Sequence, residues 1–297
     1  MLKRISFSEL SLYMACPFKR HLCYDLRMWE GKTAYTWFGT VLDDALGSLF
    51  QERKPLEEVI SIVAERLSAS SIQDPDVVAS FAKLAEKRWK RDATAQRLTD
   101  DWISIATKHL DKLSQMLMPD GTIVIPGIPE PLLFRDYQTQ LQAEGASIRF
   151  KGFVDLICQG AKTDKWYVID IKTTGRPWDF RFPDVKLKTN QLLLYKNYFI
   201  ELAQQGKLKR ISAPAIIDPA TVECWYLFLF RATSAKQEAV KIESKPASVN
   251  RSVRMIEGAG RRISQGFKQK TTDMKQCGWC HLQEKCWSGE LDTFLNA

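Results

Sequence analysis

The strongest constraint on the fold is a pair of strand-like runs, Lys151–Asp155 and Trp166–Lys172, joined by a polar turn. Both runs are rich in the β-branched and aromatic residues that strands favour. Alternate residues of a strand share a face, so Asp170 and Lys172 project together. Asp155 stands near the end of the preceding strand, where cross-strand pairing brings its carboxylate toward that of Asp170. We therefore expect two carboxylates and one lysine to converge.

A cluster of this composition indicates phosphodiester hydrolysis. Two neighbouring carboxylates raise each other's pKa unless a cation lies between them. Hard divalent ions such as Mg²⁺ bind oxygen cages of this kind, and a nearby lysine can orient a water or stabilise a phosphate oxygen. The alternative is an exposed Asp170–Lys172 ion pair on an edge strand, worth about 0–1 kcal/mol. The apolar flanks from Tyr167 to Ile171 argue against it, because they predict a buried strand in which an unpaired charge is rarely tolerated.

Length and composition are those of a globular protein. The 297 residues suffice for one large domain, or for a core domain with a substantial insertion. No apolar run approaches the ~20 residues that span a bilayer, and the first residues lack the apolar stretch of a signal peptide. We therefore expect a cytoplasmic protein with no membrane partner. The 43 basic against 35 acidic residues give a net charge of +8, which suits a polyanionic partner; a solvated basic surface is the alternative.

The N-terminal part of the chain predicts helices. Ser8 is a suitable N-cap for a helix that must end before Pro17. A longer helical period begins near Phe38, and Asp43 lies one helical step from its apolar stripe. Asp43 could therefore border the core and face a cleft. A solvated helix carboxylate is the alternative.

Helical periodicity continues from Pro55 to about Met118 and then gives way to strands. The strand-like segments after the switch are 132–141, 147–157 and 166–172, which predict an antiparallel meander. A helix at about 190–204 and a buried strand at 223–230 follow. A helix between two strands is typical of a crossover connection, so a mixed sheet flanked by helices is the simplest architecture.

These changes of pattern divide the chain into four parts. A last helix is expected at about 248–267, broken near Gly258 and Gly260. The predicted parts are N-terminal helices with the first active-site helix (1–50), a helical insertion (51–118), a core (119–245) and a C-terminal helix with a cysteine-rich segment (246–297).

The cysteines indicate a metal site. Seven cysteines in a chain without a signal peptide argue against disulfides. Cys277, Cys280 and Cys286 are close enough in sequence to bind one metal, and three thiolates need a fourth ligand. The candidates for that ligand are Cys16, Cys23 and His281, and zinc and an iron–sulfur cluster would both fit. Three unrelated surface thiols are the alternative.

Together these motifs resemble the PD-(D/E)XK nuclease superfamily, and more narrowly its RecB-like branch with an iron–sulfur cluster. That branch includes CRISPR-associated and AddB-type nucleases and some phage exonucleases. Gly152–Asp155 resembles the G-x-(I/V)-D motif of the family, and Ile169–Thr173 resembles its (D/E)-x-K core. Gln191 and Tyr195 resemble the helix motif that follows, and the matching elements span nearly the whole chain.

The resemblance implies a restriction-endonuclease-like α/β fold. Its mixed central sheet is flanked by helices, with a helical insertion, and an iron–sulfur cluster joins the N- and C-terminal segments. The resemblance selects a [4Fe–4S] cluster over zinc, and Cys16 over Cys23. The implied cluster ligands are Cys16, Cys277, Cys280 and Cys286.

The resemblance also implies a catalytic metal site. One or two Mg²⁺ or Mn²⁺ ions would be held by Asp155, Asp170, the backbone carbonyl of Ile171 and Asp43. Asp43 is a departure, because the family usually has histidine at this position. A carboxylate can still bind Mg²⁺ or Mn²⁺, so metal preference is the property most affected.

The remaining site residues are expected to act on the substrate. Lys172 orients the attacking water, and Gln191 and Tyr195 position the nucleic-acid backbone. An ordinary helix packing face is the alternative for Gln191 and Tyr195. Trp178 and Phe180 are candidates for stacking on single-stranded DNA, or else for packing.

The function that these expectations favour is a metal-dependent DNA exonuclease. It would hydrolyse single-stranded DNA in recombination, repair or phage DNA processing, beside a helicase or recombination protein, in the cytoplasm of its own cell or of a phage host. One alternative is a DNA-binding or assembly module that keeps the fold and the cluster but lost turnover through Asp43. Another is a binding protein held together by zinc.

Overall fold

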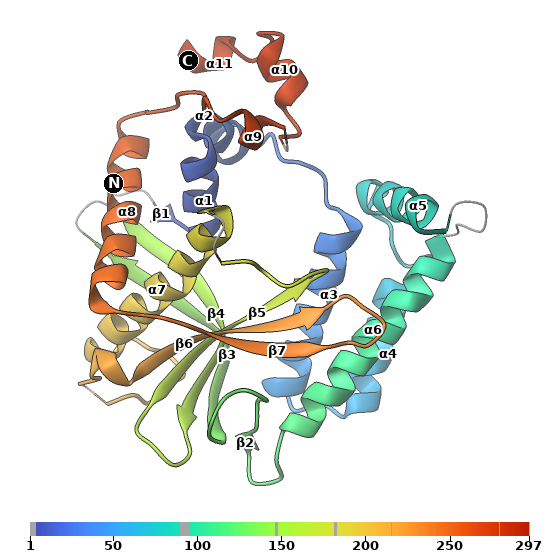
Figure 1. Ribbon diagram of the computed structural model, residues 1–297, viewed down its shortest axis with the longest axis vertical. Coiled ribbons are helices and arrows are strands. Elements are labelled where there is room, and N and C mark those ends of the chain that lie inside the picture. Colours follow the sequence, from blue (N-terminus) through green and yellow to red (C-terminus); the bar gives the residue numbers. More distant parts are fainter. Residues whose placement is uncertain are drawn as a thin grey trace.

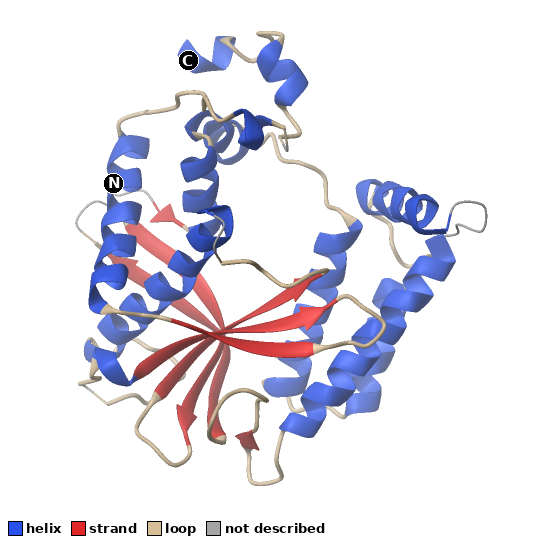
Figure 2. Ribbon diagram, viewed as in Figure 1, coloured by secondary structure: helices blue, strands red, loops and turns tan. Residues whose placement is uncertain are grey.

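A mixed sheet with helices on both faces forms the centre of the molecule (Figures 1 and 2). The computed structural model describes residues 4–89, 95–145, 148–180, 183–214, 216–278 and 280–296. Within them, the strands are β1 Arg4–Ile5, β2 Thr122–Ile123, β3 Leu132–Glu144, β4 Arg149–Gly160, β5 Trp166–Thr174, β6 Val222–Phe230 and β7 Gln237–Ile242. The expected mixed sheet is therefore confirmed, although β1, β2 and β7 were not predicted.

The described helices cover the sheet and extend beyond it. They are α1 Phe7–Ala15, α2 Pro17–Arg20, α3 Ala34–Phe50, α4 Leu56–Leu67, α5 Pro75–Trp89, α6 Ala95–Met116, α7 Pro183–Gln204, α8 Pro246–Ser264, α9 Met274–Cys277, α10 Gln283–Trp287 and α11 Thr293–Asn296. A π-helical turn at His21–Asp25 follows α2, and a short 3₁₀ turn at Pro219–Thr221 precedes β6. None of the described helices is both long and apolar enough to cross a membrane.

The strand order is β2-β3-β4-β5-β6-β7, with β1 parallel to β4 outside this path. The pair β5–β6 is parallel, and the other neighbours on the path are antiparallel. Helix α7 connects β5 to β6, as the strand–helix–strand pattern predicted. This connection places α7 beside β5, which carries Asp170 and Lys172.

Three helices differ from the expected ones for identifiable reasons: two begin at other residues, and one is not broken. Ser6, not Ser8, caps α1, because its hydroxyl accepts the Glu9 amide hydrogen bond at 3.1 Å. A reciprocal capping box between Thr33 and Thr36 starts α3 four residues before Phe38. Helix α8 continues through both of its glycines. A β-carbon on Gly260 would lie 1.7 Å from Ile148 Cγ2, so this glycine allows close packing and does not break the helix.

Two apolar cores cover the two faces of the sheet. One contains side chains of α3, α4, α5 and α6, among them Phe38, Phe50, Phe81 and Trp102. The other contains side chains of α1, α7 and α8. The helices of the expected insertion therefore share a core with the sheet. The division into four parts stays a prediction.

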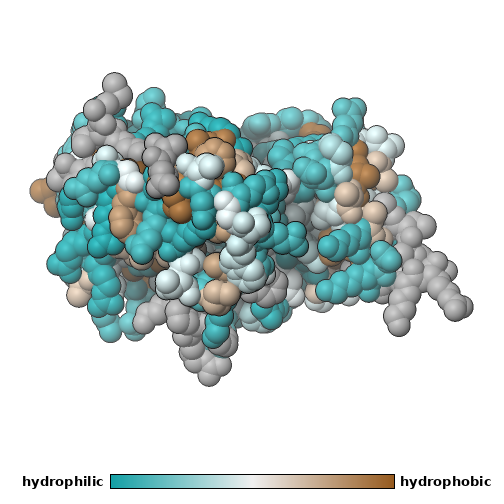
Figure 3. Space-filling view, turned by 90° about the horizontal axis from the view of Figure 1, so that it is seen from above, coloured by the Kyte–Doolittle hydropathy of each residue, from teal (hydrophilic) through white to brown (hydrophobic). Residues whose placement is uncertain are grey.

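The two ends of the chain meet above the sheet, where the α9–α11 segment lies next to α2 (Figure 1). Phe18 and Leu22 from the N-terminal part pack with Leu282 and Leu291 from the C-terminal part. A main-chain hydrogen bond of 3.1 Å from Phe18 to Gln269 also joins these segments. Seen from above, the surface is mostly hydrophilic, with apolar side chains exposed in small patches (Figure 3).

Candidate active site

The candidate active site lies where β4 and β5 diverge. The two strands pair from Gln159–Trp166 to Leu156–Ile169, and their register ends there, whereas β5 stays paired with β6 as far as Thr174. In the opening, Asp155 Oδ2 accepts a hydrogen bond of 2.7 Å from the Ile171 amide. The carboxylate thus satisfies a donor that the missing ladder would have paired. The divergence therefore holds Asp155 against Ile171, between Asp170 and Lys172.

Asp170 and Lys172 form the second part of the site. The Asp170 side chain is fully buried, and Lys172 Nζ lies 2.5 Å from its Oδ2. Asp170 Oδ2 makes this ion pair but no aligned hydrogen bond. A buried carboxylate oxygen with unused acceptor capacity is suited to bind a cation. The structure therefore brings Asp155, Asp170 and Lys172 together, as the strand pattern predicted.

Helix α7 contributes Gln191 and Tyr195 from one face of its middle part. Gln191 Nε2 donates to Asp170 Oδ1 at 3.2 Å and to the Tyr195 hydroxyl at 2.8 Å. A β-carbon on Gly152 would lie 2.6 Å from Tyr195 Cε1, so the glycine of the strand motif is what allows this tyrosine to approach β4. Tyr195 also belongs to the apolar core beside α7, so for this residue packing and contact with the site coexist.

Asp43 reaches the site from α3, on the other side of the opening. The Tyr137 hydroxyl donates to Asp43 Oδ1 at 2.6 Å and to its carbonyl oxygen at 2.9 Å. Gln138 Nε2 donates to Asp43 Oδ2 at 3.0 Å and Oδ1 at 3.2 Å, and lies 3.5 Å from Asp155 Oδ1. Asp43 therefore borders the cleft and is not a solvated helix carboxylate. Sequence reasoning did not identify Tyr137 or Gln138.

Burial and charge shift the pKa values of this cluster. Burial raises the pKa of Asp155, and the Asp170 charge raises it further. Burial also raises the pKa of Asp170, although the Lys172 charge opposes this. The pKa of Asp43 is raised by burial against the hydrogen bonds from Tyr137 and Gln138. Burial lowers the pKa of Lys172, but the charges of Asp170 and Asp155 outweigh burial and raise it.

The donor set fits a hard divalent cation in its chemistry. Three carboxylates and the Ile171 carbonyl offer oxygen ligands. The carboxylate pKa values are raised mainly by burial of the charges, and a cation would offset that cost. Across the described ranges, no three His, Cys, Asp or Glu side chains are close enough to form a ready metal cage. The amide of Gln138 and the ammonium of Lys172 instead lie against the carboxylate oxygens.

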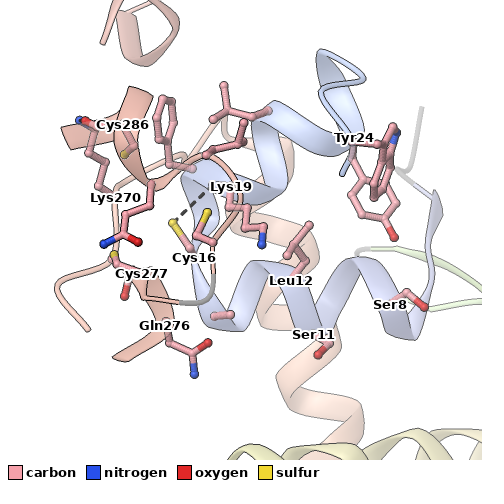
Figure 4. Close-up of a pocket in the computed structure, with 18 of the residues that line it drawn as sticks. Ser8, Ser11, Leu12, Cys16, Lys19, Tyr24, Lys270, Gln276, Cys277 and Cys286 are labelled. Carbon is pink, nitrogen blue, oxygen red and sulfur yellow. Dashed lines mark hydrogen bonds between the residues drawn. The ribbon is translucent and has the colours of Figure 1, made fainter. Parts of the chain in front are cut away.

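Two cavities adjoin the site, and Lys172 lines both of them. The smaller, of 300 Å³, opens beside α3 and is lined by Gly39, Asp43 and Asp155. The larger, of 850 Å³, extends from Lys172 and Gln191 to the segment that carries the cysteines. Figure 4 shows the end of this cavity near Cys16, Cys277 and Cys286. Lys172 is thus reached from both cavities, whereas Asp170 lines neither of them.

Four cysteines line the larger cavity. Cys16, at the junction of α1 and α2, faces Cys277 and Cys286 in Figure 4, and Cys280 belongs to the same lining. Burial raises the pKa of the Cys277 and Cys286 thiols, and the Cys16 and Cys280 thiols raise it further. The four thiols are therefore neighbours, although no three of them are at metal-ligand spacing in the described residues.

The other two candidates for the fourth ligand make different contacts. Cys23 Sγ donates to the Met28 carbonyl oxygen at 3.3 Å. His281 Nε2 lies 3.4 Å from the same oxygen, and its Nδ1 lies 3.5 Å from Glu30 Oε2. Among the three alternatives, Cys16 has the position that suits a shared ligand set.

Trp178 and Phe180 are packing residues. Both rings are half-buried against Tyr226 and Phe228, with ring centroids 5.1–6.4 Å apart. Trp178 also lines the larger cavity, where Lys188 Nζ lies 4.2 Å from its ring centroid. The packing alternative therefore describes both rings, and Trp178 also presents part of its ring to the larger cavity. A stacking role for either ring stays a prediction.

Comparisons with known proteins give a family and a fold. A family model described as "PD-(D/E)XK nuclease superfamily" matches residues 4–287. A crystal structure of a protein from Eubacterium rectale, described as "Putative exonuclease", superposes with a TM-score of 0.50. The two chains are 10% identical, and the match covers 95% of this chain and 87% of the other. No curated protein matches the chain.

Proposed function

The chain belongs to the PD-(D/E)XK nuclease superfamily, and on that premise we propose that it is a metal-dependent exonuclease of single-stranded DNA. The reaction is hydrolysis of a phosphodiester bond, in recombination, repair or phage DNA processing. One observation carries the proposal: Asp155 and Asp170 lie with Lys172 in the opening between two diverging strands. Two carboxylates can hold a divalent ion, and a lysine beside them can orient a water or a phosphate oxygen, which suits ion-dependent phosphodiester hydrolysis.

The ion would be Mg²⁺ or Mn²⁺, held by Asp155, Asp170, the carbonyl oxygen of Ile171 and Asp43. Bound there, it would supply Lewis-acid stabilisation of the phosphate and of the leaving oxygen. Carboxylate and carbonyl oxygens are hard ligands, which suit these two ions. The raised pKa values of all three carboxylates support this assignment, because a cation relieves the cost of their charges.

Lys172 acts on the water and the phosphate. Its raised pKa keeps the ammonium group charged at neutral pH, so it is a hydrogen-bond donor and not a general base. It orients the attacking water or donates to a phosphate oxygen as negative charge develops there. The water oxygen forms a bond to phosphorus and gives up a proton to solvent, while the bond to the leaving oxygen breaks and that oxygen takes up a proton. The products are one phosphate end and one hydroxyl end.

Gln191 and Tyr195 would position the strand to be cut. The Gln191 amide already links Asp170 to the Tyr195 hydroxyl, so both side chains have polar groups beside the proposed metal ligands. These groups can donate to phosphate oxygens without carrying sequence specificity.

The larger cavity supports a single strand as substrate. Its lining includes Lys19, Lys172, Lys188 and Lys270, and no aspartate or glutamate among the described residues. Tyr24, Trp29 and Trp287 add aromatic surface to the same lining. Lysines that follow a phosphate backbone and rings that stack on bases are the two components of single-strand recognition. A helicase or recombination protein would supply such strands. The protein would act in the cytoplasm.

The cysteine-lined end of this cavity would hold a [4Fe–4S] cluster. Cys16, Cys277, Cys280 and Cys286 are the proposed ligands, since all four line one cavity. Thiolates are the ligands that iron–sulfur clusters use. The cluster would join the chain ends and act structurally. A binding protein that holds zinc at the same cysteines would be colourless, whereas a protein with the cluster would be coloured.

A second candidate function, a binding or assembly module without turnover, has one observation in its favour. The Gln138 amide lies between Asp43 and Asp155, so the acidic oxygens are not at metal-ligand spacing in the described residues. Such a module would still bind DNA through its lysines. A cleavage experiment separates the two functions.

The test is digestion of single-stranded DNA labelled at its 5′ or 3′ end, after anaerobic purification, with Mg²⁺ or Mn²⁺. Wild type should release short labelled products in an order that reports the polarity of cutting. Asp170→Asn and Lys172→Ala should each lower the rate by about 10²-fold or more, because each removes a charge needed in the transition state.

The matched control is Lys162→Ala, which removes an exposed lysine at the opposite end of β5. This variant should cut at the wild-type rate. DNA binding with no cutting by wild type under either ion would favour the module without turnover. Equal cutting by Asp170→Asn and wild type would remove the proposed site.

A further inference from the structure

Gln138 occupies an unusual position on β3, directly across from Asp155. The register pairs Tyr137 with Leu156 and Thr139 with Val154, so Gln138 and Asp155 stand opposite each other between these pairs. Its φ of 57° is left-handed, a conformation that few residues other than glycine adopt inside a strand. Strained residues of this kind are concentrated at functional sites.

The left-handed residue coincides with a change of side in the sheet. Tyr137 and Leu156 belong to the core beside α3, whereas Leu141 and Val154 belong to the core beside α7. In a regular strand, residues separated by an even number of positions face the same side of the sheet. Tyr137 and Leu141 in β3, and Leu156 and Val154 in β4, do not. Gln138 marks the position at which β3 changes faces, and its side chain reaches the opening, where it contacts Asp43 and Asp155.

In that opening, the Gln138 amide is a shared donor for two acids from different elements. Its Nε2 lies 3.0 Å from Asp43 Oδ2, 3.2 Å from Asp43 Oδ1 and 3.5 Å from Asp155 Oδ1. Asp43 is also fixed by the Tyr137 hydroxyl, and Asp155 by the Ile171 amide. The Gln138 amide thus contacts the carboxylates of both Asp43 and Asp155 at once.

We infer that Gln138 is a positioning residue that competes with the divalent ion. This inference rests on the proposed function, because it concerns the same metal ligands. Without metal, the partial positive charge of the amide hydrogens holds Asp43 and Asp155 together. An ion that takes oxygens from both carboxylates must displace the amide from those oxygens. Gln138 therefore weakens metal binding and keeps the two acids in place before the ion arrives.

The role differs from that of Lys172. Lys172 pairs with Asp170 and carries a full charge that the reaction uses. Gln138 contacts Asp43 and Asp155, is neutral, and has no part in the reaction itself. Removing its side chain should therefore alter ion affinity without removing a metal ligand.

The test is the Mn²⁺ dissociation constant of the full chain, measured by electron paramagnetic resonance of free Mn²⁺. We expect Gln138→Gly to bind Mn²⁺ about tenfold more tightly than wild type, which corresponds to about 1.4 kcal/mol. Glycine tolerates the left-handed backbone, so this variant removes the amide without adding strain. Gln138→Ala should show the same direction of change if it folds.

Gln140→Ala is the matched control, because Gln140 is an exposed glutamine on the same strand. It should bind Mn²⁺ as wild type does. An unchanged or weaker affinity in Gln138→Gly, beside normal Mn²⁺ binding by wild type, overturns the role of Gln138 alone. Equal Mn²⁺ binding by wild type and Asp155→Asn overturns the proposed metal site and this inference with it.

Discussion

Asp155 shows how one side chain can serve the fold and the site at once. Its carboxylate accepts the Ile171 amide where the β4–β5 ladder ends, and it lies close to the charges of Asp170 and Asp43. The loss of the β4–β5 hydrogen bonds and the burial of a carboxylate charge would each destabilise a buried strand, and both occur at Asp155. The site is therefore assembled at a local cost in stability that a cation can relieve.

That cost predicts a pH dependence in the absence of metal. The pKa of Asp155 is raised above its usual range, so the folded state holds a proton that the unfolded state has already lost. Stability therefore falls as the pH rises from the usual value toward the raised one. We expect Asp155→Asn in EDTA to melt at a higher temperature than wild type at pH 7.

The difference between the two melting temperatures should shrink on acidification and become independent of pH below about pH 4, where Asp155 is protonated in both the folded and the unfolded state. Melting by circular dichroism across this range measures it. A variant that is less stable than wild type at pH 7 would mean that Asp155 is held by its hydrogen bond more strongly than it is opposed by its neighbours.

At the level of single residues, the sequence predicted the carboxylates of the site but not the Tyr137 and Gln138 side chains that hydrogen-bond to them. Asp155, Asp170 and Lys172 were predicted to converge because strand alternation determines which side chains share a face. Tyr137 and Gln138 could not be predicted, because a left-handed glutamine interrupts that alternation and no residue preference marks it. Their contacts depend on how α3 packs against β3, which is tertiary structure.

Among the elements, the divergence of β4 from β5 and the crossover through α7 matter most. The first opens the sheet, and the second brings Gln191 and Tyr195 to the opening. The meander and the crossover helix were predictable because their periodicities are strong. Strand β7 was not, because Gln237–Ile242 has little apolar alternation and is specified by pairing with β6.

Helix α6 is joined to the β6–β7 turn region by a buried histidine, which predicts a second pH dependence. His109 Nε2 lies 3.0 Å from the Phe230 carbonyl oxygen, and Gln237 Nε2 donates to the His109 carbonyl oxygen at 3.2 Å. Burial lowers the pKa of His109 from 6.5 to about 4. The unfolded state therefore binds a proton between these values that the folded state excludes.

We expect this histidine to cost about 3 kcal/mol of stability as the pH falls from 6.5 to 4. His109→Gln keeps a donor for the Phe230 carbonyl but cannot be protonated. The free energy of unfolding of this variant should therefore fall less steeply between pH 6.5 and 4 than that of wild type. Urea unfolding at a series of pH values measures it. Identical slopes for the variant and wild type would place the acid sensitivity elsewhere.

For the whole molecule, the contact between the chain ends is the feature that sequence patterns alone described least. Phe18 and Leu22 pack with Leu282 and Leu291, and Lys270 Nζ donates to the Cys286 carbonyl oxygen at 3.0 Å. The spacing of the cysteines left Cys16, Cys23 and His281 open as ligands, because spacing carries no information on which distant segment folds back. The fold brings Cys16 to the cavity that the other three cysteines line.

The proposed cluster predicts a coloured protein with a specific cysteine dependence. Anaerobically purified wild type should be brown and absorb near about 400 nm, as thiolate-bound iron–sulfur clusters do. Cys16→Ser and Cys286→Ser should lose this absorbance and melt at a lower temperature, because the link between the chain ends is lost. Cys23→Ser is the control, since serine can still donate to Met28, and it should keep the colour. A colourless wild type that contains zinc would contradict the cluster.

The proposed metal site between β4 and β5 is tested most directly by anomalous scattering from a crystal grown or soaked with Mn²⁺. We predict a peak in the opening between β4 and β5, within coordination distance of Asp155, Asp170 and the Ile171 carbonyl oxygen, with the Gln138 amide displaced. An opening without a peak at saturating Mn²⁺, with Lys172 still paired to Asp170, would contradict a metal-dependent nuclease at this site.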